Sequence, residues 1–156
     1  MSGITALSAQ SSAALNALNN AFAKETSFLD AADWARLTGM ARFAFATPEA
    51  FVVAFDQDAD YDSPNFLWFR DRYERFAYVD RIVVADSAHG KGLGRALYER
   101  LFEAAKAEGY PCLMAEVNTN PPNPGSLSFH ARMGFETVGE ATFSPEKSVR
   151  YFARTL

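Results

Sequence analysis

The spacing of apolar residues divides the chain into helices and strands. Leucines recur at helical spacing over residues 92–108, opposite a charged face, and predict the clearest helix, which Gly109 ends. Mainly apolar runs at Phe76–Val84 and Tyr110–Val117 predict a strand on each side of that helix. This strand–helix–strand segment forms the centre of the predicted fold.

Shorter patterns extend this segment in both directions. The other predicted elements are a strand at Ile4–Leu7, helices at Ser11–Phe22 and Asp30–Leu37 (the second stopping near Gly39), a hairpin of Arg42–Ala46 with Ala50–Phe55, a loop or short helix at Asn65–Arg75, a helix from Asn123 to Gly134, and a hairpin of Phe135–Phe143 with Lys147–Thr155. Together they predict an α/β fold in the order β-α-α-β-β-β-α-β-α-β-β, with a mixed sheet flanked by helices. A chain of 156 residues with 49% apolar side chains has the size of a single domain, residues 1–156.

Composition and charge exclude several classes of protein. The net charge is −4 and no basic run stands out, which argues against nucleic-acid binding. No apolar run approaches the length of a membrane span, and the first ten residues lack the features of a signal peptide. The single cysteine, Cys112, cannot form an intrachain disulfide, which favours a reducing compartment. We therefore expect a cytoplasmic protein with no membrane or nucleic-acid partner.

A glycine-rich turn joins the first central strand to the helix. Three glycines at alternate positions, Gly90, Gly92 and Gly94, leave the backbone N–H groups unshielded by side chains. The turn lies at a helix N-terminus, where unpaired donors and the helix dipole favour an anion. Lys91 and Arg95 add positive charge at the same place. This arrangement predicts a site for a phosphate or pyrophosphate.

Two common phosphate-binding loops do not fit this turn. A Walker loop needs Ser or Thr after Gly-Lys, whereas Gly92 follows Lys91. A dinucleotide-binding fold needs Gly-x-Gly-x-x-Gly on its first strand–helix turn, whereas the spacing here is Gly-x-Gly-x-Gly, past the middle of the chain. The segment His89-Gly90-Lys91-Gly92-Leu93-Gly94 instead resembles the Arg/Gln-x-x-Gly-x-Gly/Ala loop of the GNAT superfamily of acyl-CoA-dependent N-acetyltransferases. His89 stands where that family usually has Arg or Gln.

A second segment downstream strengthens this resemblance. The run from Asn123 to Phe135, Asn-Pro-Gly-Ser-Leu-Ser-Phe-His-Ala-Arg-Met-Gly-Phe, is similar to the family's Asn-x-x-Ala-x-x-Phe-Tyr-x-x-x-Gly-Phe segment. Ser126 replaces the usual Ala, and His130 replaces the usual Tyr. The two motifs lie about thirty residues apart in the expected order, which makes coincidence a poor explanation. The resemblance is firm over residues 74–140.

The resemblance implies a GNAT fold that uses acetyl-CoA as co-substrate. In that family the glycine loop wraps the pyrophosphate, and the strands before and after the loop splay apart to admit the pantetheine arm. The backbone N–H of Val83 or Val84 is implied to be the first pantetheine contact and the oxyanion donor. The implied cofactor-binding residues are Ile82, Val83, Val84, His89, Gly90, Lys91, Gly92, Leu93, Gly94, Arg95, Asn118, Asn123, Ser126 and Phe129.

Asp80 is the candidate general base. It lies in the middle of an otherwise apolar strand, where a carboxylate is costly unless it is paired or used. Many members of the family have a Glu base at the matching place. Strand alternation puts Asp80 on one face with Tyr78 and Ile82 and turns Arg81 to the other face. The alternative hypothesis is a structural ion pair between Asp80 and an arginine.

His130 occupies the place of the family's catalytic Tyr, which implies that its imidazole donates a proton or a hydrogen bond to the leaving sulfur. The alternative is a histidine on the helix surface or at a cap. His89 and His130 are the two histidines of the chain, and no Cys/His/Glu cluster has the spacing of a metal site. We therefore expect no metal ion.

The acceptor pocket is expected between the first two helices and the loop before the central strand. Glu25 and Asp62 could attract an ammonium group there, and Trp68 could stack on it. The alternative for each residue is a solvated loop charge or an ordinary core aromatic.

Two functions remain open. The first is an N-acetyltransferase that moves the acetyl group of acetyl-CoA to a primary amine of a small molecule or peptide. Transfer would be direct, in a ternary complex, because no sequence pattern supplies a nucleophile for a covalent intermediate. The second is a non-catalytic acyl-CoA-binding or regulatory module on the same fold. In either case the two C-terminal strands could offer the edge of a homodimer.

Overall fold

A mixed β-sheet runs through the molecule, for which a computed structural model describes residues 3–7, 12–23 and 26–156. Within these residues, seven strands form one sheet in the order β1-β2-β3-β4-β5-β7-β6. Neighbouring strands are antiparallel except β4 and β5, which are parallel. The strands are β1 (Thr5–Ala6), β2 (Phe43–Thr47), β3 (Ala50–Asp56), β4 (Ala77–Val84), β5 (Cys112–Asn120), β6 (Glu136–Ser144) and β7 (Lys147–Thr155).

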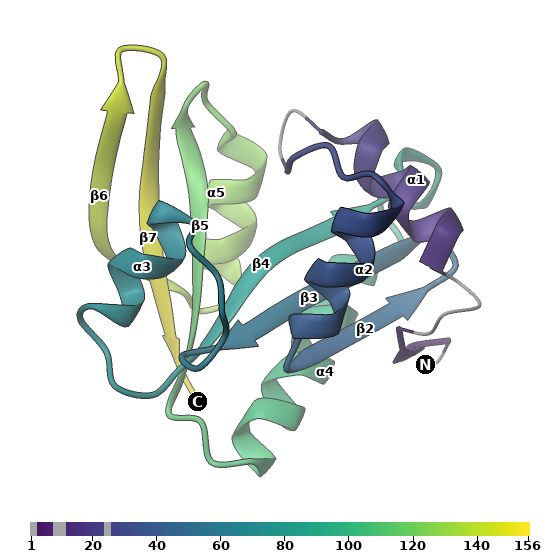
Figure 1. The fold of residues 1–156 in the computed structure, drawn as a ribbon, viewed down its shortest axis with the longest axis horizontal. Helices are drawn as coiled ribbons and strands as arrows, with labels where there is room; N and C mark the ends of the chain where they lie inside the picture. Colours follow the sequence, from purple (N-terminus) through teal and green to yellow (C-terminus); the bar gives the residue numbers. More distant parts are fainter. Residues whose placement is uncertain (1–2, 8–11, 24–25) are drawn as a thin grey trace.

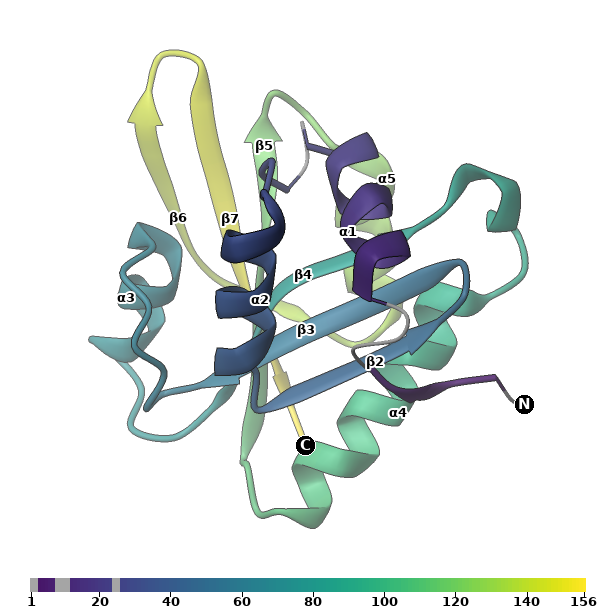
Figure 2. The same cartoon turned by 45° about the vertical axis from the view of Figure 1, so that its right-hand side comes forward.

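Helices cover both faces of this sheet (Figures 1 and 2). The helices are α1 (Ser12–Ala21), α2 (Ala31–Met40), α3 (Pro64–Arg70), α4 (Leu93–Ala107) and α5 (Pro124–Arg132), and a 3-10 turn at Asp86–Ala88 precedes α4. α1, α2 and α3 lie on one face, and α4 and α5 lie on the other. The predicted α/β fold with a mixed, mostly antiparallel sheet is therefore confirmed. No helix in the described part of the chain has the length and apolar character needed to cross a membrane.

Local sequence signals account for several element boundaries. The Asp30 side chain caps α2 by accepting a hydrogen bond from the Asp33 N–H, and Asn123 caps α5 by accepting one from the Ser126 N–H. A side-chain acceptor at this position satisfies one of the N–H groups that a helix leaves unpaired at its start. Ser11, the expected first residue of the first helix, lies outside the described residues.

Several boundaries differ from the prediction, and one alternative that the sequence left open is decided. α2 continues through Gly39 to Met40, because an interior glycine weakens a helix by only about 1 kcal/mol and packing against the sheet outweighs that cost. β5 passes the predicted end at Val117 and reaches Asn120, since its antiparallel pairing with β7 continues there. The mixed segment after Ser63 forms a short helix, α3, with proline in its first turn.

Each face of the sheet buries an apolar core of its own. β3 is buried on both faces from Ala50 to Phe55, as expected for a central strand. The core under α4 contains Leu97 and Leu101, whereas the core under α1, α2 and α3 is rich in aromatic rings that meet edge to face. The sheet is therefore held between two apolar cores, and α4 packs on one of them.

β4 and β5 pair with each other near their first residues and then separate. Ala77 pairs with Leu113 and Tyr78 with Met114, and the described strands make no further pairs with each other. In Figure 1 the two strands diverge toward their C-terminal ends. The splay that the family resemblance implied between these strands is confirmed.

Trp68 of α3 packs against β6 at a residue without a side chain. Its ring stacks on Tyr151 with 4.3 Å between centroids, and a Cβ atom at Gly139 would overlap the indole. We predict that Gly139→Ala lowers the free energy of unfolding by about 1–3 kcal/mol, because the indole or β6 must shift to make room. Denaturant unfolding measures this change.

Gly39→Ala is the matched control for that prediction. Nothing lies within 4 Å of a Cβ atom at Gly39, and alanine is favoured over glycine in a helix by about 1 kcal/mol. Gly39→Ala should therefore leave stability unchanged or raise it. Equal losses in the two variants would contradict the close packing of Trp68.

Candidate active site

The divergence of β4 from β5 leaves one edge of β4 open. The Ala85 N–H donates to the Glu49 carbonyl at 2.8 Å, toward β3. Because backbone groups alternate along a strand, Val83 also faces β3, whereas Ile82 and Val84 direct their N–H and C=O groups to the open edge. Of the two expected oxyanion donors, Val84 is therefore correctly oriented and Val83 is not. Ile82 joins Val84 as a candidate.

A cleft of about 690 Å³ lies beside this edge, between the loop after β4 and helices α4 and α5. We call it the cofactor cleft. Gly92 precedes α4 with φ at +74°, a left-handed conformation that favours glycine. The first N–H groups of α4 lack intrahelical partners and belong to residues that line the cleft. The expected cofactor residues found there are Ile82, Val83, Val84, His89, Gly90, Gly92, Leu93, Gly94, Arg95, Asn123, Ser126 and Phe129.

The basic side chains expected at the phosphate site differ in position. Lys91 does not line the cofactor cleft. Its Nζ lies 3.7 Å from the carboxylate of Glu49, which belongs to the turn between β2 and β3. Arg95 does line it, with its Nε also 3.2 Å from Glu99. Arg132 of α5 lines the cleft as well, although the sequence analysis did not select it. Positive charge therefore reaches the cleft from Arg95 and Arg132 rather than from Lys91.

His89 bridges the glycine loop and the open edge of β4. Its Nε2 lies 3.2 Å from the Val84 carbonyl, and the Asp86 carboxylate lies 3.8 Å from the same nitrogen. Nε2 donates to the carbonyl, which has no proton of its own to give. The side chain that replaces the usual Arg or Gln therefore ties the loop to the strand.

A second space of about 290 Å³, the inner cavity, continues from the cofactor cleft into the gap between β4 and β5. Apolar side chains line it on the α4 side, and polar side chains line it on the side of α1 and α3. The two spaces meet at a passage whose residues line both of them, namely Thr26, Ile82, Asn123, Ser126 and His130. A molecule that lies along β4 in the cleft can therefore reach the inner cavity.

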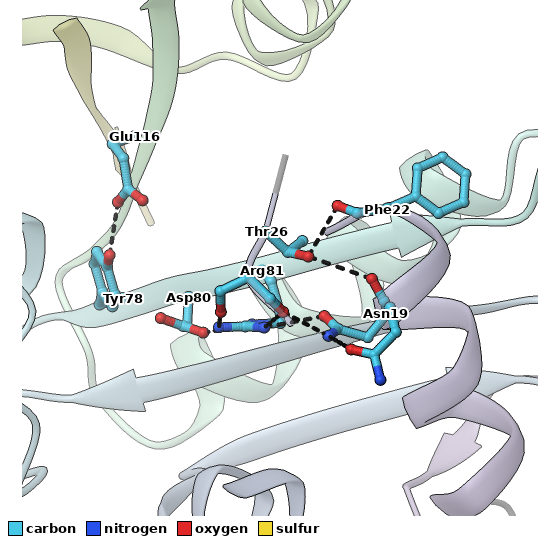
Figure 3. A network of polar contacts seen from close by, with 9 residues as sticks. Asn19, Phe22, Thr26, Tyr78, Asp80, Arg81 and Glu116 are labelled. Carbon is cyan, nitrogen blue, oxygen red and sulfur yellow. Dashed lines mark hydrogen bonds and ion pairs between the residues drawn. The ribbon is translucent and has the colours of Figure 1, made fainter. Parts of the chain in front are cut away.

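Glu116 of β5 lines the inner cavity and was not anticipated from the sequence. Its carboxylate accepts a hydrogen bond from the Tyr78 hydroxyl at 2.6 Å (Figure 3). Burial raises the pKa of Glu116 to about 8, the Tyr78 bond opposes that rise, and the charge of Asp80 adds to it. The signal was present in the sequence, since Glu116 interrupts an apolar strand just as Asp80 does.

Asp80 and Arg81 form a buried ion pair at a bulge in β4. The Arg81 Nε donates to Asp80 Oδ2 at 2.7 Å, and the two side chains are 6% and 4% exposed. Val53 of β3 faces Arg81 whereas Ala54 faces Val79, so Asp80 is the extra residue of the bulge. A bulge interrupts strand alternation, and the expectation that Arg81 turns away from Asp80 is therefore wrong. The alternative hypothesis for Asp80, a structural ion pair, is the arrangement found.

Arg81 also joins the N-terminal helices to the inner cavity. Its guanidinium donates to Asn19 Oδ1 at 3.0 Å (Figure 3). It also donates to Ser27 Oγ at 3.2 Å. Asn19 is fully buried and donates in turn to the Ser27 carbonyl at 2.8 Å. These bonds hold Thr26 and Ser27 against the cavity that both residues line.

His130 is buried between α4 and α5 rather than placed on the helix surface, with 3% of its surface exposed. Its Nδ1 lies 2.8 Å from the Ser126 carbonyl, so that nitrogen carries the proton, and its Nε2 accepts from the Tyr98 hydroxyl at 2.7 Å. Burial lowers the pKa of His130, which favours the neutral ring. The proton that the family resemblance assigned to the leaving sulfur is therefore directed at a backbone carbonyl.

The residues expected to contact the acceptor are not gathered in one place. Trp68 packs between Tyr151 and β6 and lines neither the cleft nor the inner cavity, so the core interpretation of this aromatic holds. Asp62 is exposed and lines a neighbouring space of about 440 Å³. Glu25 lies outside the described residues.

That neighbouring space, the outer cavity, adjoins the inner cavity under α2. The residues that line both are Ser27, Tyr61 and Arg81. Asn118, expected on the cofactor, lines the inner cavity instead, together with Lys147 of β7. The acceptor side of the site is therefore polar and is built from several separate segments.

Comparison with known families agrees with this geometry. Residues 12–135 match the model of the acetyltransferase (GNAT) family. The chain belongs to the GNAT family. The match covers both the glycine loop and the Asn123–Phe135 segment, the two motifs on which the resemblance was based.

Two curated relatives share parts of this GNAT sequence. The chain is 33% identical over 91 residues to an L-methionine sulfoximine/L-methionine sulfone acetyltransferase of Pseudomonas paraeruginosa, a match of 58% of the chain and 49% of the relative. It is 38% identical over 71 residues to a phosphinothricin N-acetyltransferase of Streptomyces coelicolor, covering 46% and 40%. The chain spans about half the length, or less, of these relatives.

Solved structures share the fold over nearly the whole chain. The ribosomal-protein-S18-alanine N-acetyltransferase from Escherichia coli superposes with a TM-score of 0.70 at 18% identity, over 97% of this chain and 92% of that one. A chain of the NatC complex bound to Gag peptide and CoA gives a TM-score of 0.75 at 14% identity, over 98% and 97%. At these identities the likeness shows the GNAT fold.

We predict that Asp80→Asn mainly destabilises the protein. The change leaves the Arg81 charge buried without its counter-charge, which costs about 3–5 kcal/mol. Urea unfolding measures the loss. Asp33→Asn is the control, because its pair with Arg36 is exposed and 3.7 Å long and should contribute less than about 1 kcal/mol. Equal losses in the two variants would contradict a structural role for the buried pair.

Proposed function

We propose that this chain transfers the acetyl group of acetyl-CoA to a primary amine of a small molecule, with both substrates bound together. The observation that carries the proposal is the continuity between the cofactor cleft and the inner cavity that holds Glu116. Acetyl-CoA supplies an activated thioester. In the reaction a carbon–nitrogen bond to the amine forms, the carbon–sulfur bond breaks, and one amine proton is lost.

The cofactor cleft has groups suited to the different parts of coenzyme A. The first N–H groups of α4 and the Arg95 side chain favour a pyrophosphate. The open edge of β4 offers the N–H and C=O of Val84 to the amides of the pantetheine arm, in the way that a peptide adds to a sheet edge. His89 occupies that carbonyl and would exchange partners when the arm binds.

The backbone N–H of Ile82 is the group we assign to the thioester oxygen. Ile82 lines both the cofactor cleft and the inner cavity, and its N–H faces the open edge between them. A fixed donor at the oxygen where negative charge develops contributes about 10²–10³ in rate in other acyl-transfer enzymes. Val84 lies two residues further along β4, and its N–H and C=O groups are assigned to the pantetheine arm.

Glu116 is the group we assign as general base, in place of Asp80. Its pKa near 8 is close to the operating pH, where a base is both partly ionised and strong enough to take a proton. Asp80 is paired with the Arg81 guanidinium, whose Nε lies 2.7 Å from Asp80 Oδ2. We therefore assign Asp80 the role of holding the bulge rather than that of moving a proton.

His130 has no direct role as an acid in this proposal. Its proton is donated to the Ser126 carbonyl, and a neutral imidazole is a very weak acid. A thiolate leaving group is a modest base, comparable to cysteine with a pKa of about 8.5, so it can depart without a proton donor. Glu116 is then the one side chain needed for proton transfer.

The acceptor proposed here is a small molecule rather than a large one. The inner cavity holds about 290 Å³, and its acceptor side combines Glu116 with polar side chains such as Asn65 and Lys147. The two curated relatives are named for small amine substrates. An amine in this cavity lies beside the Glu116 carboxylate, which can hold the ammonium form before it loses a proton.

Two measurements distinguish the proposed acetyl transfer from the alternative function, acyl-CoA binding without turnover. Calorimetric titration with acetyl-CoA should show binding, and a panel of amines should then release the thiol. Binding without thiol release for any amine would favour the non-catalytic module. Absence of binding at millimolar acetyl-CoA would overturn both functions.

We predict that Glu116→Gln lowers kcat by about 10²–10⁴, the usual contribution of a general base. The base acts when it is deprotonated, so wild-type kcat/KM, which reports the pKa of the free enzyme, should rise with pH through about 8 and level off above it. The acceptor used should be an amine with a pKa below about 7, so that its own deprotonation does not contribute to the pH profile. In Glu116→Gln the rise should disappear while the Kd for acetyl-CoA stays unchanged.

Asp62→Asn is the control for the Glu116 prediction. This carboxylate is exposed in the outer cavity and should leave the pH profile in place. A Glu116→Gln variant that keeps both the wild-type rate and the rise near pH 8 would overturn the assignment of the base.

We predict that Gly92→Ala weakens acetyl-CoA binding by at least about tenfold. A side chain in the left-handed region costs about 1–2 kcal/mol, and relief of that strain would turn the first N–H groups of α4 away from the cleft. Gly109→Ala is the matched control, because Gly109 has φ at +85° at the far end of the same helix. Both variants should lose stability, and only Gly92→Ala should raise the Kd measured by calorimetry.

A further inference from the structure

We propose that Tyr98 sets the length of the acyl group that this protein accepts, because its ring closes the inner cavity beyond the passage from the cofactor cleft. The inference rests on the proposed acetyl-CoA-dependent transfer. It concerns the acyl donor rather than the amine, and nothing in the two sequence motifs addresses it.

The acyl group has to pass a narrow set of residues to reach the inner cavity. Ile82 and His130 line both the cofactor cleft and the inner cavity, so they mark the point of entry. Beyond it the α4 side of the cavity is apolar and is lined by Val79, Ala115 and Val117, each at most 4% exposed. These side chains belong to the core under α4, and they provide the surface that suits a methyl group.

Tyr98 stands directly past this point of entry. It lines the inner cavity but not the cofactor cleft, and its exposed fraction is 0%. Its hydroxyl lies 2.7 Å from Nε2 of His130, which is itself a residue of the passage. An acyl chain that grows into the α4 side of the cavity therefore meets the phenol ring.

The Tyr98 ring cannot move aside at low cost. It packs on Phe102, Phe129 and Phe135 with ring centroids between 5.4 and 5.7 Å away. Its hydroxyl donates to His130, so a rotation would leave the buried Nε2 without a donor, and an unpaired buried polar atom is destabilising. A wall held by both packing and a hydrogen bond discriminates by size.

The other side of the inner cavity offers a longer chain no suitable space. It is lined by Tyr61, Asn65 and Glu116, which are polar and belong to the acceptor side. An acyl chain directed there would displace the amine and bury methylene groups against a carboxylate. Both routes therefore favour acetyl over longer acyl groups.

The test compares acetyl-, propionyl-, butyryl- and hexanoyl-CoA with one amine acceptor. For the wild type we expect kcat/KM to fall by about tenfold or more with each added methylene, the discrimination that a tight apolar pocket achieves. In Tyr98→Ala the ratio of butyryl-CoA to acetyl-CoA should rise by at least about tenfold, since the removed ring leaves room for the chain. Calorimetry should show the same change in Kd without an acceptor present.

Two further variants distinguish loss of the Tyr98 ring from loss of its hydroxyl and from a general loss of core packing. Tyr98→Phe keeps the ring and removes the hydroxyl, and it should keep the wild-type preference for acetyl. Leu101→Ala creates a comparable cavity in the same helix and core but lines neither space, so it should also keep that preference. Tyr98→Leu replaces Tyr98→Ala if the alanine variant does not fold.

Failure of this inference is distinguishable from failure of the proposed function. If the wild type releases no thiol from acetyl-CoA with any amine, the proposed function is wrong. If the wild type acetylates but uses hexanoyl-CoA as well as acetyl-CoA, Tyr98 does not limit the acyl group. The same conclusion follows if Tyr98→Ala folds and keeps the wild-type ratio.

Discussion

A strand edge inside a folded protein carries N–H and C=O groups that cost free energy when they have no partner. β4 has such an edge, because β5 leaves it after two paired positions. α4 packs on the core of one face of the sheet, and α1, α2 and α3 pack on the core of the other face (Figure 2). His89 satisfies the last exposed carbonyl, that of Val84, and the cofactor cleft runs along the rest of the edge. The cofactor cleft and the inner cavity both border this gap in the sheet.

Polar groups near the gap are arranged in pairs that differ in character. Asp80 with Arg81 is a buried ion pair whose arginine also bonds Asn19 and Ser27, which suits a group that fixes the bulge. Tyr98 with His130 is a neutral pair, buried deeper, that holds a ring in place. Glu116 has a single neutral donor and a raised pKa, so it is the member whose protonation can change near neutral pH. The proposed base is therefore Glu116, whose hydrogen-bond partner is neutral, rather than Asp80, whose partner is charged.

The sequence predicted most of the fold because its signals are local. The caps at Asp30 and Asn123, the leucine spacing of α4 and the glycine loop each act within one turn or strand, and the structure has them where they were expected. The cofactor cleft was predicted for the same reason, since two contiguous motifs supply most of its lining. Lys91 was misplaced because its position depends on Glu49, a residue far away in the sequence.

The inner cavity was harder to predict, because its residues come together through packing. The bulge at Asp80 cannot be read from a strand pattern, and it reverses the expected direction of Arg81. Glu116 carried the same signal as Asp80, a carboxylate in an apolar strand, but only the separation of β4 from β5 exposes it to a cavity. Tyr98 was not singled out from the sequence, because its hydroxyl finds its partner, His130, only when α4 and α5 pack together.

The hydrogen bonds from Arg81 to Asn19 and Ser27 connect the N-terminal part of the chain to the inner cavity. The cofactor cleft is formed mainly by β4, α4 and α5, whereas Thr26 and Ser27 of the loop between α1 and α2 form one wall of the inner cavity, where Arg81 and Asn19 hold Ser27. Substitutions in that loop can therefore reshape the inner cavity while most of the cofactor cleft stays unchanged. Under the proposed function, this separation would let the amine site change without loss of acetyl-CoA binding.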